Sequence, residues 1–205
     1  MTQVTQYWNH NVHYQPVITG AVPARCGTAL DVGCGDGMLG CQLAERCGIV
    51  TGIDSDPRMI ELARERAGAS GGAAVANVTF VLDDFLKYRF QEASFDFVCA
   101  NTVVHHMGTA EAFRKMASIL RPGGRLAVVG LGAYGSRTEY LPDLAAIPLN
   151  RYYQRTLGEG DPGCPKLEPD LTWAQVRETA RRILPGARYR RHLLWRYSVI
   201  WDKAA

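Results

Sequence analysis

Glycines and aspartates follow the short apolar runs of this 205-residue chain, and both can take part in ligand binding. Gly33, Gly35 and Gly37 alternate in the stretch ALDVGCGDGMLG, between an apolar run and an expected helix. Glycine permits positive φ and lets a ligand lie against the backbone, because no Cβ stands between them. The first N–H groups of the helix have no intrahelical acceptor and can bind a polar or anionic group. The stretch therefore predicts a strand–loop–helix site for a small molecule.

Two kinds of ligand fit this glycine loop. Gly35, Gly37 and Gly40 match the G-x-G-x-x-G pattern of dinucleotide-binding folds, which places a pyrophosphate at the start of the helix. Asp31 lies inside the end of the apolar run, where a carboxylate would repel a pyrophosphate and attract an ammonium group. Asp31 and Gly33 therefore favour a zwitterionic, sulfonium-bearing ligand such as S-adenosylmethionine. A nicotinamide-dependent oxidoreductase remains the alternative.

The elements that position these residues alternate between strands and helices. We expect strands at 29–32, 49–53, 78–82, 95–100 and 125–131, and helices at 38–47, from Pro57 onward, at 110–120 and at 172–184. The helix at Pro57 begins after a Ser55 or Asp56 cap, and Thr172 caps the last helix. Two final strands, 188–194 and 196–202, are close enough in sequence to form an antiparallel hairpin. The pattern predicts an α/β fold: a doubly wound, mostly parallel seven-stranded sheet with helices on both faces.

The length of the chain favours a single domain, 1–205, with four parts. We expect a short helical lead-in at 1–26, broken by Pro16 and Pro23, and a ligand-binding core at 27–131 that contains a loop at 67–74. An insert at 132–170 is expected to cover the substrate site, and a terminal helix and hairpin follow at 171–205.

Composition narrows the class of protein. The hydrophobic content is 47% and the charged content 21%, both ordinary for a globular protein. No apolar run approaches the ~20 residues that span a bilayer, and the N-terminus lacks a signal-peptide pattern. The six cysteines show no metal-binding spacing. We therefore expect a cytoplasmic protein with reduced thiols, without a metal site and without a membrane partner.

Five motifs follow one another in the order typical of one enzyme family. ALDVGCGDG, GIDSD, FVLDDF, FDFVCANTVVHHM and LRPGGRL resemble the ordered motifs of class I S-adenosylmethionine-dependent methyltransferases. The resemblance covers residues 27–131, and the terminal helix and hairpin are similar to the last part of that fold. It implies S-adenosylmethionine as cofactor, S-adenosylhomocysteine as product, and methyl transfer to an oxygen or nitrogen of a small molecule by in-line displacement. A methyltransferase-like protein that binds the cofactor without transferring its methyl group is a further alternative.

The resemblance and the side-chain chemistry together assign contacts to the methionine and ribose parts of the cofactor. Gly33 and Gly35 would contact the methionine part through their backbone, and Asp31 would bind its ammonium group. Asp54 would accept hydrogen bonds from both ribose hydroxyls, a geometry that suits a carboxylate. Ser55, the next residue, is also a candidate for cofactor binding.

The other end of the cofactor has its own candidates. Asp84 would accept a hydrogen bond from the adenine amino group, with Asp83 as the alternative by one register, and Phe85 would offer a backbone N–H to the ring. In the lead-in, Tyr14 or His13 is expected to close over the cofactor, as an aromatic residue does in many relatives. Apolar packing of the lead-in alone is the other interpretation.

Catalytic residues are expected after the fourth strand. Asn101 would lie near the sulfonium, and His105 or His106 is a candidate general base, needed only if the acceptor must lose a proton. A buried, hydrogen-bonded histidine is the alternative for at least one of the pair. Further candidates for the acceptor pocket, named by position, are His10, His13, Tyr134, Tyr152, Tyr153 and Arg155.

The charge distribution bears on the partners of the protein. The net charge is +3, and the part from residue 171 onward carries eight Arg or Lys against two acids. A basic surface can attract nucleic acid, but it is more commonly a solvated face. The run Asn101-Thr102-Val103-Val104 also lacks the Asn/Asp-Pro-Pro-Tyr/Phe signature of enzymes that methylate base nitrogens. We therefore expect a small-molecule acceptor rather than nucleic acid, and a monomer or homodimer.

Overall fold

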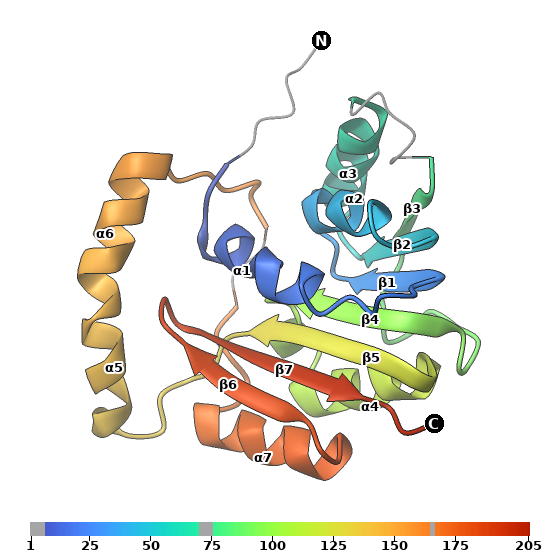
Figure 1. The fold of residues 1–205 in the computed structure, drawn as a ribbon. Coiled ribbons are helices and arrows are strands. Elements are labelled where there is room, and N and C mark those ends of the chain that lie inside the picture. Colours follow the sequence, from blue (N-terminus) through green and yellow to red (C-terminus); the bar gives the residue numbers. More distant parts are fainter. Residues whose placement is uncertain (1–6, 70–75, 165–166) are drawn as a thin grey trace.

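The chain folds around one seven-stranded sheet, described in a computed structural model for residues 7–69, 76–164 and 167–205. The strand order is β3-β2-β1-β4-β5-β7-β6. Five strands are parallel: β1 (Thr28–Val32), β2 (Ile49–Asp54), β3 (Val78–Leu82), β4 (Phe95–Asn101) and β5 (Leu120–Gly130). β7 (Arg196–Asp202) runs antiparallel between β5 and β6 (Arg188–His192). The predicted doubly wound sheet with a terminal antiparallel hairpin is confirmed (Figure 1).

Helices cover both faces of the sheet because alternate strand residues point to opposite faces. Val98 and Leu126 pack with α4 (Thr109–Ile119) and α7 (Trp173–Ile183). Phe97 and Ala127 pack with α1 (His10–Thr19) and α2 (Met38–Ala44) on the other face. α3 (Pro57–Ala69) lies against β2, β3 and α2. Figure 1 shows α4 and α7 on one side of the sheet and α1, α2 and α3 on the other. Burial on both faces accounts for the apolar character of the central strands.

Several element boundaries differ from those predicted. α1 continues through Pro16, which was expected to break the lead-in, because Tyr14 and Ile18 are buried against the sheet. α2 ends at Ala44. α3 extends to Ala69, so the predicted loop at 67–74 begins later, and its residues 70–74 lie outside the described residues. β5 begins at Leu120, because Leu120 pairs with β4 and the segment predicted as a turn, 121–124, pairs with Lys203.

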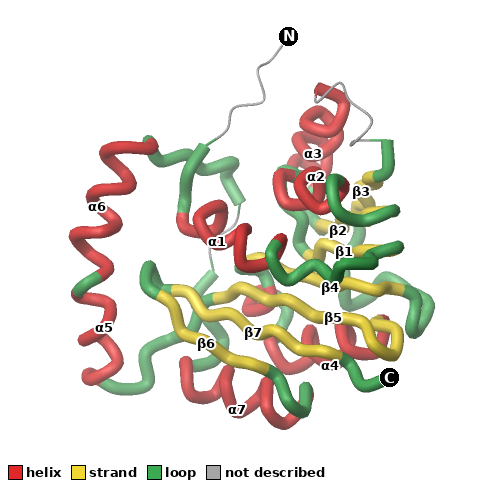
Figure 2. The backbone as a smooth tube through the Cα atoms, viewed as in Figure 1, coloured by secondary structure: helices red, strands yellow, loops and turns green. Residues whose placement is uncertain are grey.

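The insert leaves the sheet and returns to it. It contains α5 (Leu141–Leu144) and α6 (Ala146–Leu157), which follow one another in a column beside the sheet (Figure 2). After α6 the chain returns toward α1, where Glu159 forms a parallel bridge with Trp8. α7 follows, and its predicted cap is confirmed, because Thr172 and Gln175 form a reciprocal capping box. None of the helices in the described ranges has the length and apolarity that a membrane crossing requires.

Candidate functional site

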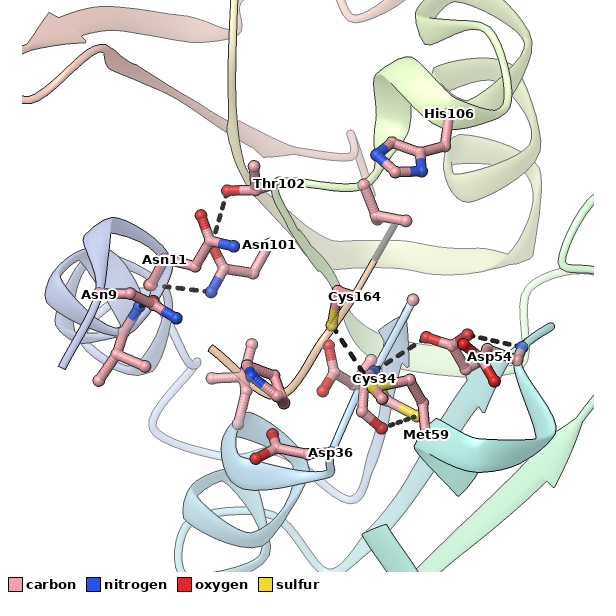
Figure 3. Close-up of a pocket in the computed structure, with 18 of the residues that line it drawn as sticks. Asn9, Asn11, Cys34, Asp36, Asp54, Met59, Asn101, Thr102, His106 and Cys164 are labelled. Carbon is pink, nitrogen blue, oxygen red and sulfur yellow. Dashed lines mark hydrogen bonds between the residues drawn. The ribbon is translucent and has the colours of Figure 1, made fainter. Parts of the chain in front are cut away.

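A cavity of about 550 Å³ lies at the carboxyl ends of the parallel strands. Its walls come from the residues that follow β1, β2, β3 and β4, from the segment before α1 and from the return of the insert (Figure 3). The order of the strands reverses between β1 and β4, and ligands of open α/β sheets bind outside the strand ends at such a point. The fold thus brings the predicted glycine loop and strand-end aspartates to one cavity.

The glycine loop requires residues without a Cβ at two places. Gly33 has a φ of +64°, and a Cβ built on it would lie 2.4 Å from Cγ2 of Val103. Gly35 has a φ of +53° and lines the cavity, where the nearest atom to a built Cβ is Sγ of Cys164, 3.8 Å away. A side chain at Gly35 would therefore occupy the cavity itself, so this glycine leaves room for a ligand against the backbone.

Asp54 ties β2 to the glycine loop and still faces the cavity. Its Oδ2 accepts a hydrogen bond from the Gly35 N–H at 2.9 Å, and its Oδ1 accepts one from the Asp56 N–H at 3.0 Å. Each carboxylate oxygen can accept a second hydrogen bond, so both remain able to bind hydroxyl groups. Ser55 lines the cavity beside it. The arrangement fits a ribose with two free hydroxyls.

Asp31 is a buried carboxylate that lacks a full set of partners. Its side chain lines the cavity, only 1% of the residue is exposed, and Oδ2 is buried without a hydrogen-bond partner. Burial raises the pKa of Asp31 to about 7, the Cys99 thiol partly offsets this rise, and the carboxylates of Asp54 and Asp36 add to it. A buried charge of this kind needs a cation or a hydrogen-bond donor. An ammonium group bound in the cavity would supply both.

The residues after β3 also reach the cavity. Asp83, Asp84 and Phe85 all line it. Oδ1 of Asp84 accepts a hydrogen bond from the Leu86 N–H at 2.8 Å, and Oδ2 forms an ion pair with Lys87 at 3.1 Å. Hydrogen bonding and charge from Lys87 lower the pKa of Asp84, so it is ionised at neutral pH. Since both aspartates lie at the cavity, the choice of Asp84 over Asp83 stays a prediction.

The end of β4 turns sharply over the glycine loop. Thr102 adopts a positive φ of 61°, which brings Val103 against Gly33. His105 and His106 follow in a short 3-10 helix, with ring centroids 4.3 Å apart, and both line the cavity. Burial lowers the pKa of His105 to about 4 and also lowers that of His106. At neutral pH His105 is therefore uncharged, and its lowered pKa makes it a weaker base than a free imidazole.

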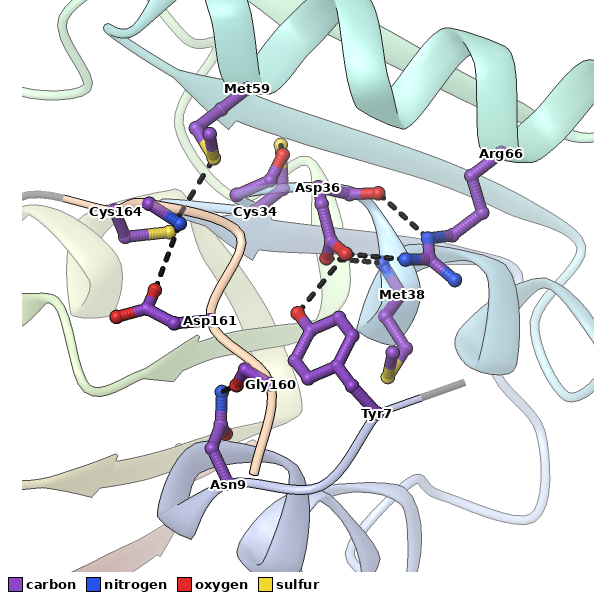
Figure 4. Close-up of polar contacts among 12 residues, drawn as sticks. Tyr7, Asn9, Cys34, Asp36, Met38, Met59, Arg66, Gly160, Asp161 and Cys164 are labelled. Atoms are coloured by element: carbon purple, nitrogen blue, oxygen red, sulfur yellow. Dashed lines mark hydrogen bonds and ion pairs between the residues drawn. The ribbon is translucent and has the colours of Figure 1, made fainter. Parts of the chain in front are cut away.

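Two segments far apart in the sequence cover the cavity together. The Gly160 N–H donates to the Trp8 carbonyl at 3.0 Å, and the Asn9 side chain donates to the Gly160 carbonyl at 3.1 Å. The Tyr7 hydroxyl donates to Asp36 at 3.0 Å, and Asp36 also forms a buried ion pair with Arg66 (Figure 4). This cover encloses the ligand space from the side away from the sheet.

Not every predicted residue reaches the cavity. Tyr14 and His13 do not line it, and the Tyr14 hydroxyl donates instead to the Leu193 carbonyl at 2.5 Å. The prediction that Tyr14 closes over the cofactor is thus not supported, and Tyr7 is the lead-in tyrosine at the cavity. Of the further acceptor-pocket candidates, His10 lines it, whereas Tyr134, Tyr152, Tyr153 and Arg155 do not.

Sequence reasoning also missed residues that line the cavity. Asn11 accepts a hydrogen bond from the side chain of Asn101 through its backbone carbonyl at 3.0 Å. Asp36 follows Gly35 in the glycine motif, which is the one sequence signal that pointed to it. The other missed lining residues carried no such signal, and they include Tyr7, Asn9, Met59, Glu159, Asp161 and Cys164.

Comparison with known proteins identifies the family of the chain. A family model described as a methyltransferase domain matches residues 29–124. An uncharacterized methyltransferase of Mycobacterium tuberculosis is 33% identical over 198 residues, which cover 96% of this chain and 97% of the relative. The chain belongs to the class I S-adenosylmethionine-dependent methyltransferases. The nicotinamide alternative for the glycine loop is therefore set aside.

Two further matches place this methyltransferase among relatives. It is 36% identical over 114 residues to the 27-O-demethylrifamycin SV methyltransferase of Amycolatopsis mediterranei, a match that covers 54% of this chain and 41% of the relative. The solved structure of a SAM-dependent methyltransferase from Methanosarcina mazei superposes with a TM-score of 0.63 at 19% identity, covering 92% of this chain and 97% of the other. The match to the Methanosarcina structure shows that the fold is shared over nearly the whole chain.

Proposed function

We propose that this methyltransferase transfers the methyl group of S-adenosylmethionine to an oxygen or nitrogen of a small molecule by in-line displacement. The observation that carries the proposal is the unpartnered carboxylate oxygen of Asp31, buried at a cavity beside a glycine loop. An ammonium group is the natural partner for it. S-adenosylmethionine carries such a group, whereas a dinucleotide pyrophosphate does not.

The remaining cofactor contacts follow from the geometry of the strand ends. Gly33 and Gly35 let the methionine part lie against the backbone, and Asp54 binds the ribose hydroxyls with both oxygens. Asp84 and the Phe85 backbone, at the end of the neighbouring strand, bind the adenine. The adenine, ribose and methionine sites thus follow the strand order β3, β2, β1. Asn101 and His105, at and after the end of β4, would then lie beside the methyl group.

The size of the cavity and its cover support a small acceptor. Its volume of about 550 Å³ lies within the range of sites for small molecules, and the cofactor takes part of it. The contacts of Trp8 and Asn9 with Gly160 close it from above. The Amycolatopsis relative is named for methylation of a small molecule at oxygen. A polymer such as nucleic acid would have to displace this cover before reaching the cofactor.

The chain's own residues then have limited chemistry to perform. S-adenosylmethionine supplies a methyl group on a sulfonium that leaves as a neutral thioether. Asp31, the glycine loop and Asp54 fix that group in place, so that the acceptor attacks along the line of the breaking bond. The neutral imidazole of His105 can accept the proton that a hydroxyl or ammonium acceptor must lose.

The direct test is turnover with a panel of small alcohols, phenols, amines and acids. The purified protein would be incubated with S-adenosylmethionine and each compound, and S-adenosylhomocysteine would be quantified by mass spectrometry. We expect product with a subset of the panel, and a fall of about 10²-fold or more in kcat for His105→Ala with hydroxyl acceptors. His106→Ala is the matched control and should retain more activity. Tight cofactor binding without product from any compound would favour the non-catalytic alternative.

A further inference from the structure

The cavity carries a buried positive charge on the side away from the cofactor aspartates. Arg196 begins β7 and lines the cavity with 8% of its surface exposed. β7 is antiparallel to β5, so its first residue lies at the same sheet edge as the ends of the parallel strands. Asp31, Asp54 and Asp84 come from or follow β1, β2 and β3, and β4 and β5 separate those strands from β7. The strand-end aspartates thus lie toward one end of the sheet and Arg196 toward the other.

The hydrogen bonds of Arg196 involve only neutral acceptors. Its Nη2 donates to Oδ1 of Asn11 at 2.7 Å. Its Nη1 donates to the carbonyls of Trp195 at 3.1 Å and Leu194 at 3.5 Å. Its Nε is buried and has no partner. A guanidinium has five N–H donors, so these three acceptors leave some donors without a partner. None of the three acceptors balances the positive charge.

No counter-ion for this charge lies among the described residues. Arg196 takes part in none of the ion pairs found there, and no other Arg or Lys of the described chain lines the cavity. The neighbouring imidazoles of His10 and His105 cannot balance it, because a histidine side chain is either neutral or positively charged. A buried charge is stable in proteins when it is paired, and an unpaired one calls for a partner from outside the chain.

We propose that the methyl acceptor carries an acidic group, a carboxylate or a phosphate monoester, which binds to Arg196. The inference rests on the proposed function, because it assigns this part of the cavity to the acceptor. Guanidinium and oxyanion form charge-assisted hydrogen bonds, which are about twice as strong as neutral ones. The acidic end of the acceptor lies at β7, and its nucleophilic atom then faces the methyl group near β4. Asn11 holds the guanidinium in place for this contact.

Arg196 also has a structural role that the test must separate from anion binding. Leu194 and Trp195 both adopt positive φ, 54° and 58°, and Arg196 donates to their carbonyls. A purely structural arginine would stabilise this hairpin turn and show no preference among bound molecules. The preference of the unaltered protein for an anion over its neutral counterpart is therefore the decisive quantity.

The experiment compares benzoate, phenyl phosphate and benzamide as probes. Each is titrated by calorimetry into the protein saturated with S-adenosylhomocysteine, which leaves the acceptor site open. We expect one or both anions to bind and benzamide to bind at least tenfold more weakly. Arg196→Gln should reduce anion affinity by about 10- to 100-fold and leave benzamide unchanged. Arg196→Lys keeps the charge but lacks the planar guanidinium. Its affinity for the anions should lie between those of the unaltered protein and Arg196→Gln.

The controls distinguish the possible failures. Arg190→Gln removes an exposed arginine of the adjacent strand outside this cavity and should leave anion binding unchanged. Equal binding of benzamide and the anions by the unaltered protein would overturn the inference, whether or not Arg196→Gln folds. So would undiminished anion binding by a folded Arg196→Gln. A protein that does not bind S-adenosylhomocysteine at all would overturn the proposed function, and this inference with it.

Discussion

Replacement of Asp31 by asparagine tests the buried carboxylate through the pH dependence of cofactor binding. Without a ligand, Asp31 has a pKa of about 7, raised from 3.8, mainly by burial. A rise of about three units corresponds to about 4 kcal/mol between the two protonation states. Because the folded-state pKa is the higher one, the folded protein holds the extra proton. Its free energy of unfolding should therefore fall as pH rises from about 4 to about 7.

Binding of an ammonium group requires the ionised form of Asp31. With a pKa of about 7, roughly one tenth of the ligand-free protein is ionised at about pH 6 and nine tenths at about pH 8. The apparent Kd for S-adenosylhomocysteine should then be about tenfold larger at the lower pH. Asp31→Asn should bind the product weakly at both pH values and without this dependence. The same variant should be more stable than the unaltered protein at about pH 8, by up to about 4 kcal/mol.

Calorimetric titration with S-adenosylhomocysteine at several pH values between these limits measures the first effect, and urea unfolding measures the second. Asp84→Asn is the matched control: the pKa of Asp84 is lowered, so it stays ionised throughout this range. That variant should weaken binding while keeping the tenfold pH dependence. A flat affinity in the unaltered protein, or the same slope in Asp31→Asn, would refute the role given to Asp31.

Three further predictions concern stability. Gly33→Ala forces a Cβ to 2.4 Å from Val103 at positive φ, and should lower the free energy of unfolding by about 2–4 kcal/mol, measured in urea; a loss below 1 kcal/mol would contradict this packing. Arg66→Met leaves the buried Asp36 carboxylate without its ion-pair partner and should cost about 3–5 kcal/mol by the same measurement, whereas an unchanged midpoint would disprove the pairing. Thr172→Ala removes the α7 cap and should cost about 1 kcal/mol in thermal unfolding, and no change in Tm would count against the capping box.

Much of the fold could be predicted because its signals are local. The bounds of β3 and β7 are those predicted, since both are short apolar runs with clear flanking residues. The start of β5 was missed because Pro122 and Gly123 mark a turn in the sequence, whereas Leu120 before them and Arg125 after them both pair with β4 across a register shift. Pairing with β4 and Lys203 is a tertiary interaction that local propensity does not contain.

The site was predictable where motifs lie at strand ends and not where segments meet through folding. Asp31 lies near the end of β1 and Asp54 at the end of β2, so both could be placed at the site from their predicted strands. Tyr14 was misplaced because the face of α1 that meets the sheet depends on how the helix docks, which its own sequence leaves open. The position of Arg196 at the active edge could be deduced from the predicted hairpin. Its burial without a counter-ion could not, because that depends on every other residue around the cavity.

Calorimetric titration with S-adenosylmethionine, S-adenosylhomocysteine and NADH tests whether the cavity binds the methyltransferase cofactor. It would be done on the unaltered protein and on Asp31→Ala and Asp54→Ala. We expect micromolar, one-to-one binding of the methylated and demethylated cofactor, weakened in both variants, and no binding of NADH. Binding of NADH alone would contradict the assignment of the cofactor. So would a failure of the unaltered protein to bind any of the three compounds.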